Sequence, residues 1–309
     1  MRVLSGPWRD WAPTGEASSL TVGVLDGVHM GHRELVSHLD PELNRTVLTF
    51  DPHPVEVLAP GTAPRLLTTI DERVALLGRL GVSQVGVLDL AEIKSLAPIE
   101  FVDMVLVGKM RLGHLVTGPD FRFGRDRTGD VALLEGLADR HGFRLEIIAA
   151  VGDGIGPVSS TRIRTLLEAG QPEEAAKLLG SWYQVTSTVM RGDRRGADLG
   201  YPTLNLRPPP RKLIPATGVY ACFASVAGIA HPAAVNVGVR PTFGGGELLI
   251  EAHLLDFDRS AYGEQATIEF VRFLRPELRF DRVDDLIDHI GEDVEKARKA
   301  LGAVAPNMS

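Results

Sequence analysis

The sequence is poor in the residues that several protein classes require. It contains a single cysteine, Cys222, so it can form neither an intrachain disulfide nor a cluster of thiolate metal ligands. No apolar stretch approaches the roughly 18 residues that a bilayer-spanning helix needs, and the first residues lack the apolar core of a secretion signal. We therefore expect a cytoplasmic protein that does not bind membranes.

Positive charge is also scarce. The 33 lysines and arginines are outnumbered by 40 aspartates and glutamates, which gives a formal net charge of −7. Proteins that bind nucleic acids usually carry a basic face, so this balance argues against a nucleic-acid partner. A small phosphate-bearing ligand is not excluded, because a local cluster of hydrogen-bond donors is enough to bind one.

The first part of the chain alternates short β-branched runs with helical patterns, which predicts an α/β doubly wound domain. The expected strands are residues 20–24, 47–50, 85–88, 114–117 and 145–149. They lack polar alternation, as is typical of a parallel sheet that is covered on both faces. In such sheets ligands collect at the carboxyl ends of the strands. Helices are expected at residues 31–39 and 71–80, where Val74, Leu77 and Leu80 share one face.

The rhythm changes after Trp182. Strand-like pieces are now separated by glycine and proline turns, for example at residues 200–202 and 208–210, which predicts an antiparallel β-barrel or sandwich. Residues 284–301 repeat apolar side chains at steps of three and four, which predicts a terminal helix against the barrel. We expect two domains, residues 1–180 and 181–309.

The stretch GVLDGVHMGH at residues 23–32 follows the first expected strand. Glycines let the backbone approach a ligand closely, and the N-terminus of the following helix favours phosphate. His29 and His32 could donate hydrogen bonds to phosphate oxygens and stabilise charge during phosphoryl transfer. A metal-binding pair or two surface histidines would explain the same residues, so the motif alone leaves these alternatives open.

Two further segments could belong to the same site. In Gly118–Gly124, Phe121 or Phe123 could pack against a ring-shaped ligand, although a phenylalanine in such a place is more often a core residue. Ser159, Ser160 and Thr161 open a helix, and one of them could simply cap it. Together with Arg162 and Arg164 they also provide hydroxyl donors and positive charge for a phosphate.

The N-terminal half resembles the nucleotidyltransferase module of bacterial bifunctional riboflavin kinase/FAD synthetases. The matching pieces are GVLDGVHMGH (23–32), TFDPHP (49–54), DFRFG (120–124) and SSTRIR (159–164). The resemblance implies adenylyl transfer from ATP to FMN, which yields FAD and pyrophosphate, with His29 and His32 in catalysis. It implies ATP binding by Gly23, Asp26, Gly27, His29, Gly31, His32, Ser159, Ser160, Thr161 and Arg164. The flavin ligands it implies are Asp51, Pro52, His53, Asp120, Phe121 and Phe123.

The C-terminal half resembles the riboflavin kinase module of the same family. Its matching pieces are LGYPTLN (199–205), NVGVRPTF (236–243), IEAHLLD (250–256), Tyr262-Gly263 and Phe273–Arg275, and residues 191–196 resemble the flap over the nucleotide. The resemblance implies phosphorylation of riboflavin to FMN, with Glu251 as the general base. It implies ATP binding by Gly192, Gly200, Pro202, Thr203 and Asn205, and Mg²⁺ binding by Thr203 and Asn205.

Elementary chemistry agrees with these roles. Thr203 and Asn205 lie two residues apart, so on an extended chain their side chains project to the same side. Their oxygen atoms suit Mg²⁺, which is bound largely through substrate phosphates. A carboxylate such as Glu251 could accept the proton of an attacking hydroxyl. Singly, Pro202-Thr203 could be a turn and Glu251 an exposed strand residue.

Several positions depart from the family pattern. Val24 and Leu25 stand where many members have asparagine and an aromatic residue. Pro119 follows Gly118 where an acidic or aromatic residue is more usual, and Ala197 stands where an arginine is common. One alternative is therefore a divergent flavin-binding paralogue that has lost one or both activities or acts on a modified flavin. Another is an adenylyl- or cytidylyltransferase for a different phosphorylated substrate. The expected partners are riboflavin, FMN and ATP, and we expect a monomer or weak homo-oligomer.

Overall fold

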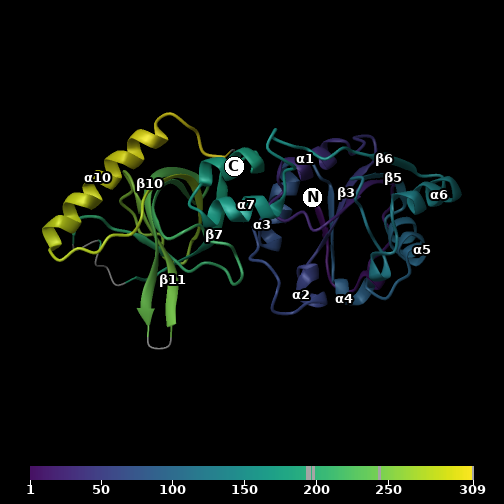
Figure 1. Ribbon diagram of the computed structural model, residues 1–309, viewed down its shortest axis with the longest axis horizontal. Coiled ribbons are helices and arrows are strands. Elements are labelled where there is room, and N and C mark those ends of the chain that lie inside the picture. Colours follow the sequence, from purple (N-terminus) through teal and green to yellow (C-terminus); the bar gives the residue numbers. More distant parts are fainter. Residues whose placement is uncertain (193–195, 197–198, 243–244, 308–309) are drawn as a thin grey trace. The chain divides into compact units, whose positions relative to one another are not determined.

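The computed structural model describes residues 1–192, 196, 199–242 and 245–307, with the backbone alone for 240–242 and 245–247. The chain forms two compact units, Met1–Ser159 and Ser160–Ser309 (Figure 1). The expected domain boundary at residue 180 stays a prediction. Residues 160–180 form two helices, and these pack on the elements that follow them.

The first unit is built on a six-stranded sheet in which every pair of neighbours is parallel, which confirms the expected sheet type. The strand order is β1-β4-β3-β2-β5-β6. Five strands overlap the expected runs, whereas β1, a three-residue strand at the edge, was not predicted. The strands are β1 (Arg2–Leu4), β2 (Ser18–Val22), β3 (Asn44–Phe50), β4 (Gln84–Leu88), β5 (Leu112–Thr117) and β6 (Arg144–Ile147).

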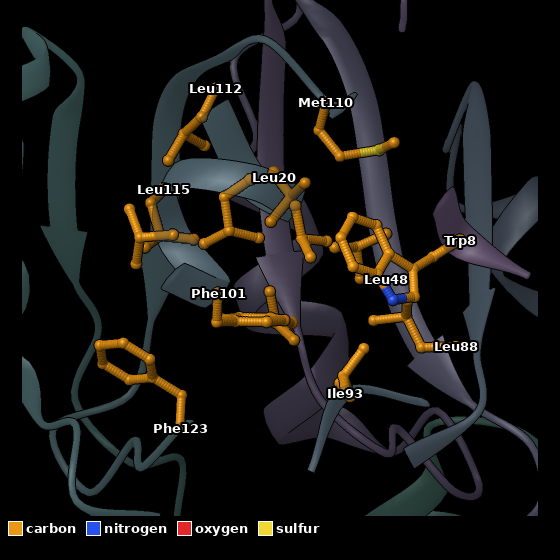
Figure 2. Packing of buried hydrophobic residues seen from close by; sticks show 14 of the residues in the cluster. Trp8, Leu20, Leu48, Leu88, Ile93, Phe101, Met110, Leu112, Leu115 and Phe123 are labelled. Carbon is orange, nitrogen blue, oxygen red and sulfur yellow. The ribbon is translucent and has the colours of Figure 1, made fainter. Parts of the chain in front are cut away.

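Hydrophobic cores cover both faces of this sheet. Adjacent residues on one strand belong to different cores: on β3, Leu48 packs in the first and Val47 in the second. The first core also contains Trp8, Phe101 and Phe123 (Figure 2). Since successive strand side chains point to opposite faces, this division requires helices on both sides of the sheet. They are η1 (Trp8–Asp10), α1 (Met30–Ser37), α2 (Pro54–Leu58), α3 (Ile70–Arg79), α4 (Leu90–Ile93), α5 (Pro98–Glu100), the π-helix η2 (Phe101–Lys109), η3 (Arg125–Arg127) and α6 (Val131–His141).

The second unit is a closed antiparallel barrel with the strand order β10-β11-β8-β7-β12-β9. This confirms the expected antiparallel barrel and excludes the sandwich. The strands are β7 (Tyr183–Met190), β8 (Leu204–Leu206), β9 (Gly218–Val226), β10 (Ile229–Thr242), β11 (Gly245–Leu254) and β12 (Gln265–Arg275). Two helices precede them, α7 (Ser160–Glu168) and α8 (Pro172–Leu179).

The terminal helix α10 (Val283–Leu301) packs along β9, β10 and β12 (Figure 1). Its Ala297 and Leu301 are buried with Phe223 of β9 and Val271 of β12, as the expected apolar stripe requires. In the part of the chain that the structure describes, no helix is both long and apolar enough to cross a membrane.

Candidate active sites

The first candidate site is the turn that joins β2 to α1. Leu25 and Val28 both adopt left-handed backbone angles there, with φ of 49° and 43°. Residues with a Cβ rarely adopt this region, and such positions gather at ligand-binding and catalytic sites. Gly27, with a φ of 85°, adopts it without steric cost. The turn delivers His29 to the N-cap position of α1, beside the backbone N–H groups that open the helix.

The imidazoles of His29 and His32 stack on each other in this turn. Their ring centroids are 3.6 Å apart and their planes are inclined by 18°. A Cβ on Gly31 would lie 3.2 Å from Cε1 of His29, so the glycine leaves room for the stack. Burial, reinforced by the nearby His29 and Arg73, holds the pKa of His32 well below its usual value. His32 is therefore neutral near pH 7, with one ring nitrogen able to donate and one able to accept.

The strands bring three predicted segments to one edge of the sheet. β3, β2 and β5 are neighbours, and residues 51–54, 23–32 and 118–124 follow their carboxyl ends. Nδ1 of His32 is buried at this edge and has no hydrogen-bond partner within the described residues. A buried polar atom is normally satisfied, so this nitrogen favours a ligand at the same place.

Asp26, predicted to bind ATP, is engaged by its own chain. It is 2% exposed and accepts hydrogen bonds from the backbone N–H of Leu67 (3.0 Å) and Thr68 (2.9 Å) and from the Thr68 hydroxyl (3.0 Å). The N–H of Gly27 donates to the same hydroxyl at 3.1 Å. These bonds tie the turn to the segment before α3. Contact of Asp26 or Gly27 with ATP stays a prediction.

The predicted flavin residues after β3 lie at the sheet edge in different environments. Asp51 is exposed and Pro52 is half-buried. His53 caps α2: its Nδ1 accepts from the N–H of Val55 at 3.2 Å, and its own N–H donates to Glu56 at 3.0 Å. This local role explains a histidine at position 53 without a ligand, so a contact with flavin stays a prediction.

The aromatic pair after β5 divides between core and surface. Phe121 and Phe123 stack with centroids 5.5 Å apart. Phe123 is 6% exposed and belongs to the core, whereas Phe121 is half-buried and packs against it. Asp120 is exposed. Phe121 thus retains free ring surface for a planar ligand.

The remaining predicted ATP residues lie on either side of the chain division after Ser159, or directly after β2. Ser159 is the last residue of the first unit, and Ser160, Thr161 and Arg164 lie in α7, which opens the second. Gly23 donates its N–H to the carbonyl of Leu48 at 3.0 Å. The roles of these residues in binding ATP stay predictions.

The second candidate site lies on three adjacent barrel strands. Asn205 of β8 pairs in register with Glu251 of β11, which pairs in turn with Asn236 of β10. Residues in register on neighbouring strands point to the same face of a sheet. The antiparallel ladder therefore sets a carboxylate between two amides, as the predicted pairing of Asn205 with Glu251 requires.

Two cavities meet at this row. One has a volume of about 410 Å³ and is lined by Asn205, Glu251 and Asn236, together with residues of α10. The other, of about 280 Å³, is lined by Gly192, Pro202 and the segment 257–262. Thr203 and Asn205 line both cavities, whereas Glu251 lines the larger one alone. The arrangement suits two substrates that meet at a hydroxyl and an amide.

Backbone close to these residues is tightly packed. A Cβ on Gly192 would lie 2.5 Å from Cγ of Asn205, so the chain passes directly against the amide. Gly200 has a φ of 87° in the turn before Pro202. The carbonyl of Pro202 accepts a hydrogen bond of 2.9 Å from Nδ1 of His253.

Of the expected flap, residues 193–195 lie outside the described residues, as do Ala197 and Phe243.

The larger cavity is also lined by an ion pair of Arg275, which lies in a matching motif, with Asp293, which lies in none. Arg275 of β12 binds Asp293 of α10 through Nε at 3.0 Å and Nη2 at 2.6 Å. Their side chains are 17% and 5% exposed. Asp293 lies three residues after Ile290 and four before Ala297, so its place on the inward stripe of the helix was a usable signal.

The donor set near Asn205 fits Mg²⁺ bound together with a phosphate. Within the described residues, no three His, Cys, Asp or Glu side chains gather to hold a metal by themselves. Thr203 and Asn205 offer a hydroxyl and an amide oxygen, and Asn205 Nδ2 donates to the Thr203 carbonyl at 3.3 Å. Mg²⁺ keeps several waters and takes its remaining ligands from substrate phosphates, so a small neutral oxygen set suits it.

Comparison with known proteins matches both units. Residues 12–162 match the FAD synthetase family and residues 179–301 match the riboflavin kinase family. A bifunctional riboflavin kinase/FMN adenylyltransferase of Listeria monocytogenes is 35% identical over 94% of this chain and 93% of its own length. Its namesake in Pseudomonas fluorescens is 37% identical over 92% of each chain.

A solved structure agrees with the fold of the whole chain. The crystal structure of a protein named macrolide-efflux protein, from Streptococcus pneumoniae, is 30% identical, has a TM-score of 0.87 and covers 100% of both chains. The two family matches, and the identity to curated relatives across nearly the full length, agree with the two units described above. The chain belongs to the family of bifunctional riboflavin kinase/FMN adenylyltransferases.

Proposed function

We propose that the two units act in succession on one flavin. The barrel unit transfers the γ-phosphoryl group of ATP to riboflavin and yields FMN and ADP. The α/β unit transfers the adenylyl group of a second ATP to FMN and yields FAD and pyrophosphate. The observation that carries this proposal is the row Asn205–Glu251–Asn236, with Thr203 and Asn205 shared by two cavities.

In the kinase reaction the flavin occupies the larger cavity and ATP the smaller one. Glu251 lines only the larger cavity, where its carboxylate can accept the proton of the primary ribityl hydroxyl as that oxygen attacks the γ-phosphorus. Thr203 and Asn205, at the boundary of the cavities, hold the transferring phosphate. Bound there, Mg²⁺ would neutralise charge on the phosphate oxygens. In-line transfer depends mainly on such positioning and charge stabilisation.

In the adenylyl transfer the nucleophile is already an anion. A phosphate oxygen of FMN attacks the α-phosphorus of ATP, so no base is needed to remove a proton. The stacked histidines instead donate N–H groups to phosphate oxygens while negative charge shifts to the leaving pyrophosphate. The low pKa of His32 suits this role, because a neutral imidazole donates without exchanging its proton.

Incubation of the purified protein with riboflavin, ATP and Mg²⁺, followed by chromatography of the flavins, tests the proposal. FMN and then FAD should accumulate, and absence of both would refute it. The presence of Glu251, Asn205 and the stacked histidines favours this function over a flavin-binding paralogue without turnover. A cytoplasmic location and a monomer or weak homo-oligomer remain expectations.

A further inference from the structure

An arginine is buried beside the turn between β2 and α1. This turn, residues 23–29, leads into the helix of His32 and is called the histidine turn. Arg73, on α3, is 2% exposed. Burying a guanidinium costs free energy unless its charge is paired and its N–H groups are hydrogen-bonded. The contacts of Arg73 therefore indicate what it does. Neither the sequence motifs nor the two reactions assign it a role.

The guanidinium of Arg73 joins three segments around the site. Its Nη1 donates to the Thr49 hydroxyl at 2.9 Å and to the Phe50 carbonyl at 3.0 Å, where β3 ends. Its Nη2 lies 3.8 Å from a carboxylate oxygen of Asp26, in the histidine turn. Its Nε lies 3.4 Å from the hydroxyl of Thr68, which also bonds to Asp26.

The contact with Thr49 continues into the histidine turn. The Thr49 hydroxyl donates its own proton to the carbonyl of Val24 at 2.8 Å. Arg73 therefore reaches the turn from two sides, through Thr49 to Val24 and directly to Asp26. The left-handed residues Leu25 and Val28 lie between and beside these anchors, and strained backbone persists only where its surroundings hold it.

We propose that Arg73 is a positioning residue for adenylyl transfer: it fixes the turn that carries His29 and His32. The proposal rests on the function assigned above to the first unit. Position and charge act together, because an imidazole that is misplaced, or that gains a proton, no longer presents the same N–H to a phosphate.

The charge of Arg73 acts on the histidines directly. Burial lowers the pKa of His32 most and the stacked His29 comes second. The positive charge of Arg73 lowers the same pKa further. The carboxylates that face Arg73 are Asp26 and Asp51. Without the guanidinium this lowering is lost, so the pKa of His32 should rise in its absence.

Arg45 provides a matched control in the same unit. It lies at the start of β3, whereas Arg73 contacts its end, and it donates to the carbonyl of Val36 in α1 at 2.7 Å and to that of Gly81 at 3.3 Å. Arg45 thus contacts the helix of His32 but at the far end from the histidines. Removing it costs packing and hydrogen bonds without changing the charge beside the stack.

The test compares Arg73→Met, Arg73→Lys and Arg45→Met in the full chain. FAD formation from FMN and ATP is measured against FMN formation from riboflavin, which reports on the other unit. In Arg73→Met we expect kcat/KM for FAD formation to fall about a hundredfold, the loss that misplacement of a catalytic group by about 1 Å brings. FMN formation should be unchanged, and Arg45→Met should leave both activities unchanged.

Titration of the histidine ring signals by NMR separates positioning from simple stability. His32 is assigned among the nine histidines by the signal that His32→Asn removes. Its pKa should rise in Arg73→Met and stay at the native value in Arg45→Met. Arg73→Lys keeps the charge but loses the planar fork, so it should retain the native titration and recover only part of the activity.

Several results would overturn the proposal. Native FAD formation in Arg73→Met or in Arg73→Lys would do so, as would an unchanged His32 titration in Arg73→Met. Loss of folding of the first unit in both variants would make Arg73 purely structural and would also overturn it. If the unmodified protein makes no FAD, the proposed function fails, and the His32 titration still decides the inference about Arg73.

Discussion

Gly192 passes so close to Asn205 that the smallest side chain at this position should impair the kinase. A Cβ built on Gly192 would lie 2.5 Å from Cγ and 2.6 Å from Oδ1 of Asn205. Relaxed carbon contacts are about 3.5 Å or more, so the overlap approaches 1 Å. Because Asn205 is held in the barrel by its pairing with Glu251, its side chain or the Gly192 backbone must shift.

The size of the effect follows from the cost of overpacking. Forcing an extra methyl into a closely packed site costs about 1–3 kcal/mol. If the strain is relieved by displacing the Asn205 amide from the phosphate, Gly192→Ala should lower kcat/KM for FMN formation roughly 5- to 150-fold. Steady-state rates of FMN formation from riboflavin measure this directly, and FAD formation from added FMN should stay at the native rate.

Gly302→Ala is the matched control in the same unit. Gly302 has a φ of −64°, and a Cβ there would lie 3.4 Å from its nearest neighbour, an ordinary contact. This variant should leave FMN formation unchanged. Native FMN formation in Gly192→Ala, or a parallel loss of both activities, would refute the placement of Gly192 against a catalytic amide.

Three further predictions concern stability. The pKa of His32 is lower in the folded than in the unfolded chain, so acid should destabilise the first unit as pH falls below about 6.5. Urea titrations at several pH values measure this loss of unfolding free energy. In His32→Asn the unfolding free energy should depend less steeply on pH. Asp293→Asn should lower the unfolding free energy of the barrel by about 3–5 kcal/mol in urea titrations. The substitution leaves Arg275, whose side chain is 17% exposed, charged and without its ionised partner. A loss below about 1 kcal/mol would contradict this. Burial raises the pKa of Cys222, so a thiol reagent should label it only as the barrel unfolds, and rapid labelling of the native protein would show the burial to be wrong.

Elements with a strong hydrophobic period were predictable from the sequence. The buried runs of β3, β4 and β5 and the inward stripe of α10 all lie close to their expected residues. The π-helix η2 was missed, because residues 101–109 are apolar nearly throughout and show no period. The strand β1 was missed because three residues, of which only Leu4 is buried, cannot show alternation.

The candidate sites divide in the same way. Asn205 and Glu251 could be predicted because each lies in a short motif, although only the barrel ladder shows that they are in register. Arg73 and Asp293 act through contacts with distant segments, which no local motif encodes. Each nevertheless left a trace, since Arg73 lies four residues before the buried Leu77 on α3 and thus on its inward face.

The central claim is that one chain holds two independent sites, and a pair of single substitutions tests it most directly. His32→Ala and Glu251→Ala should each be supplied first with riboflavin and then with FMN, together with ATP and Mg²⁺, and the flavin products separated by chromatography. The account predicts that His32→Ala forms FMN but no FAD, and that Glu251→Ala forms FAD from added FMN but no FMN from riboflavin. Loss of both products in either variant, with the protein still folded, would contradict it.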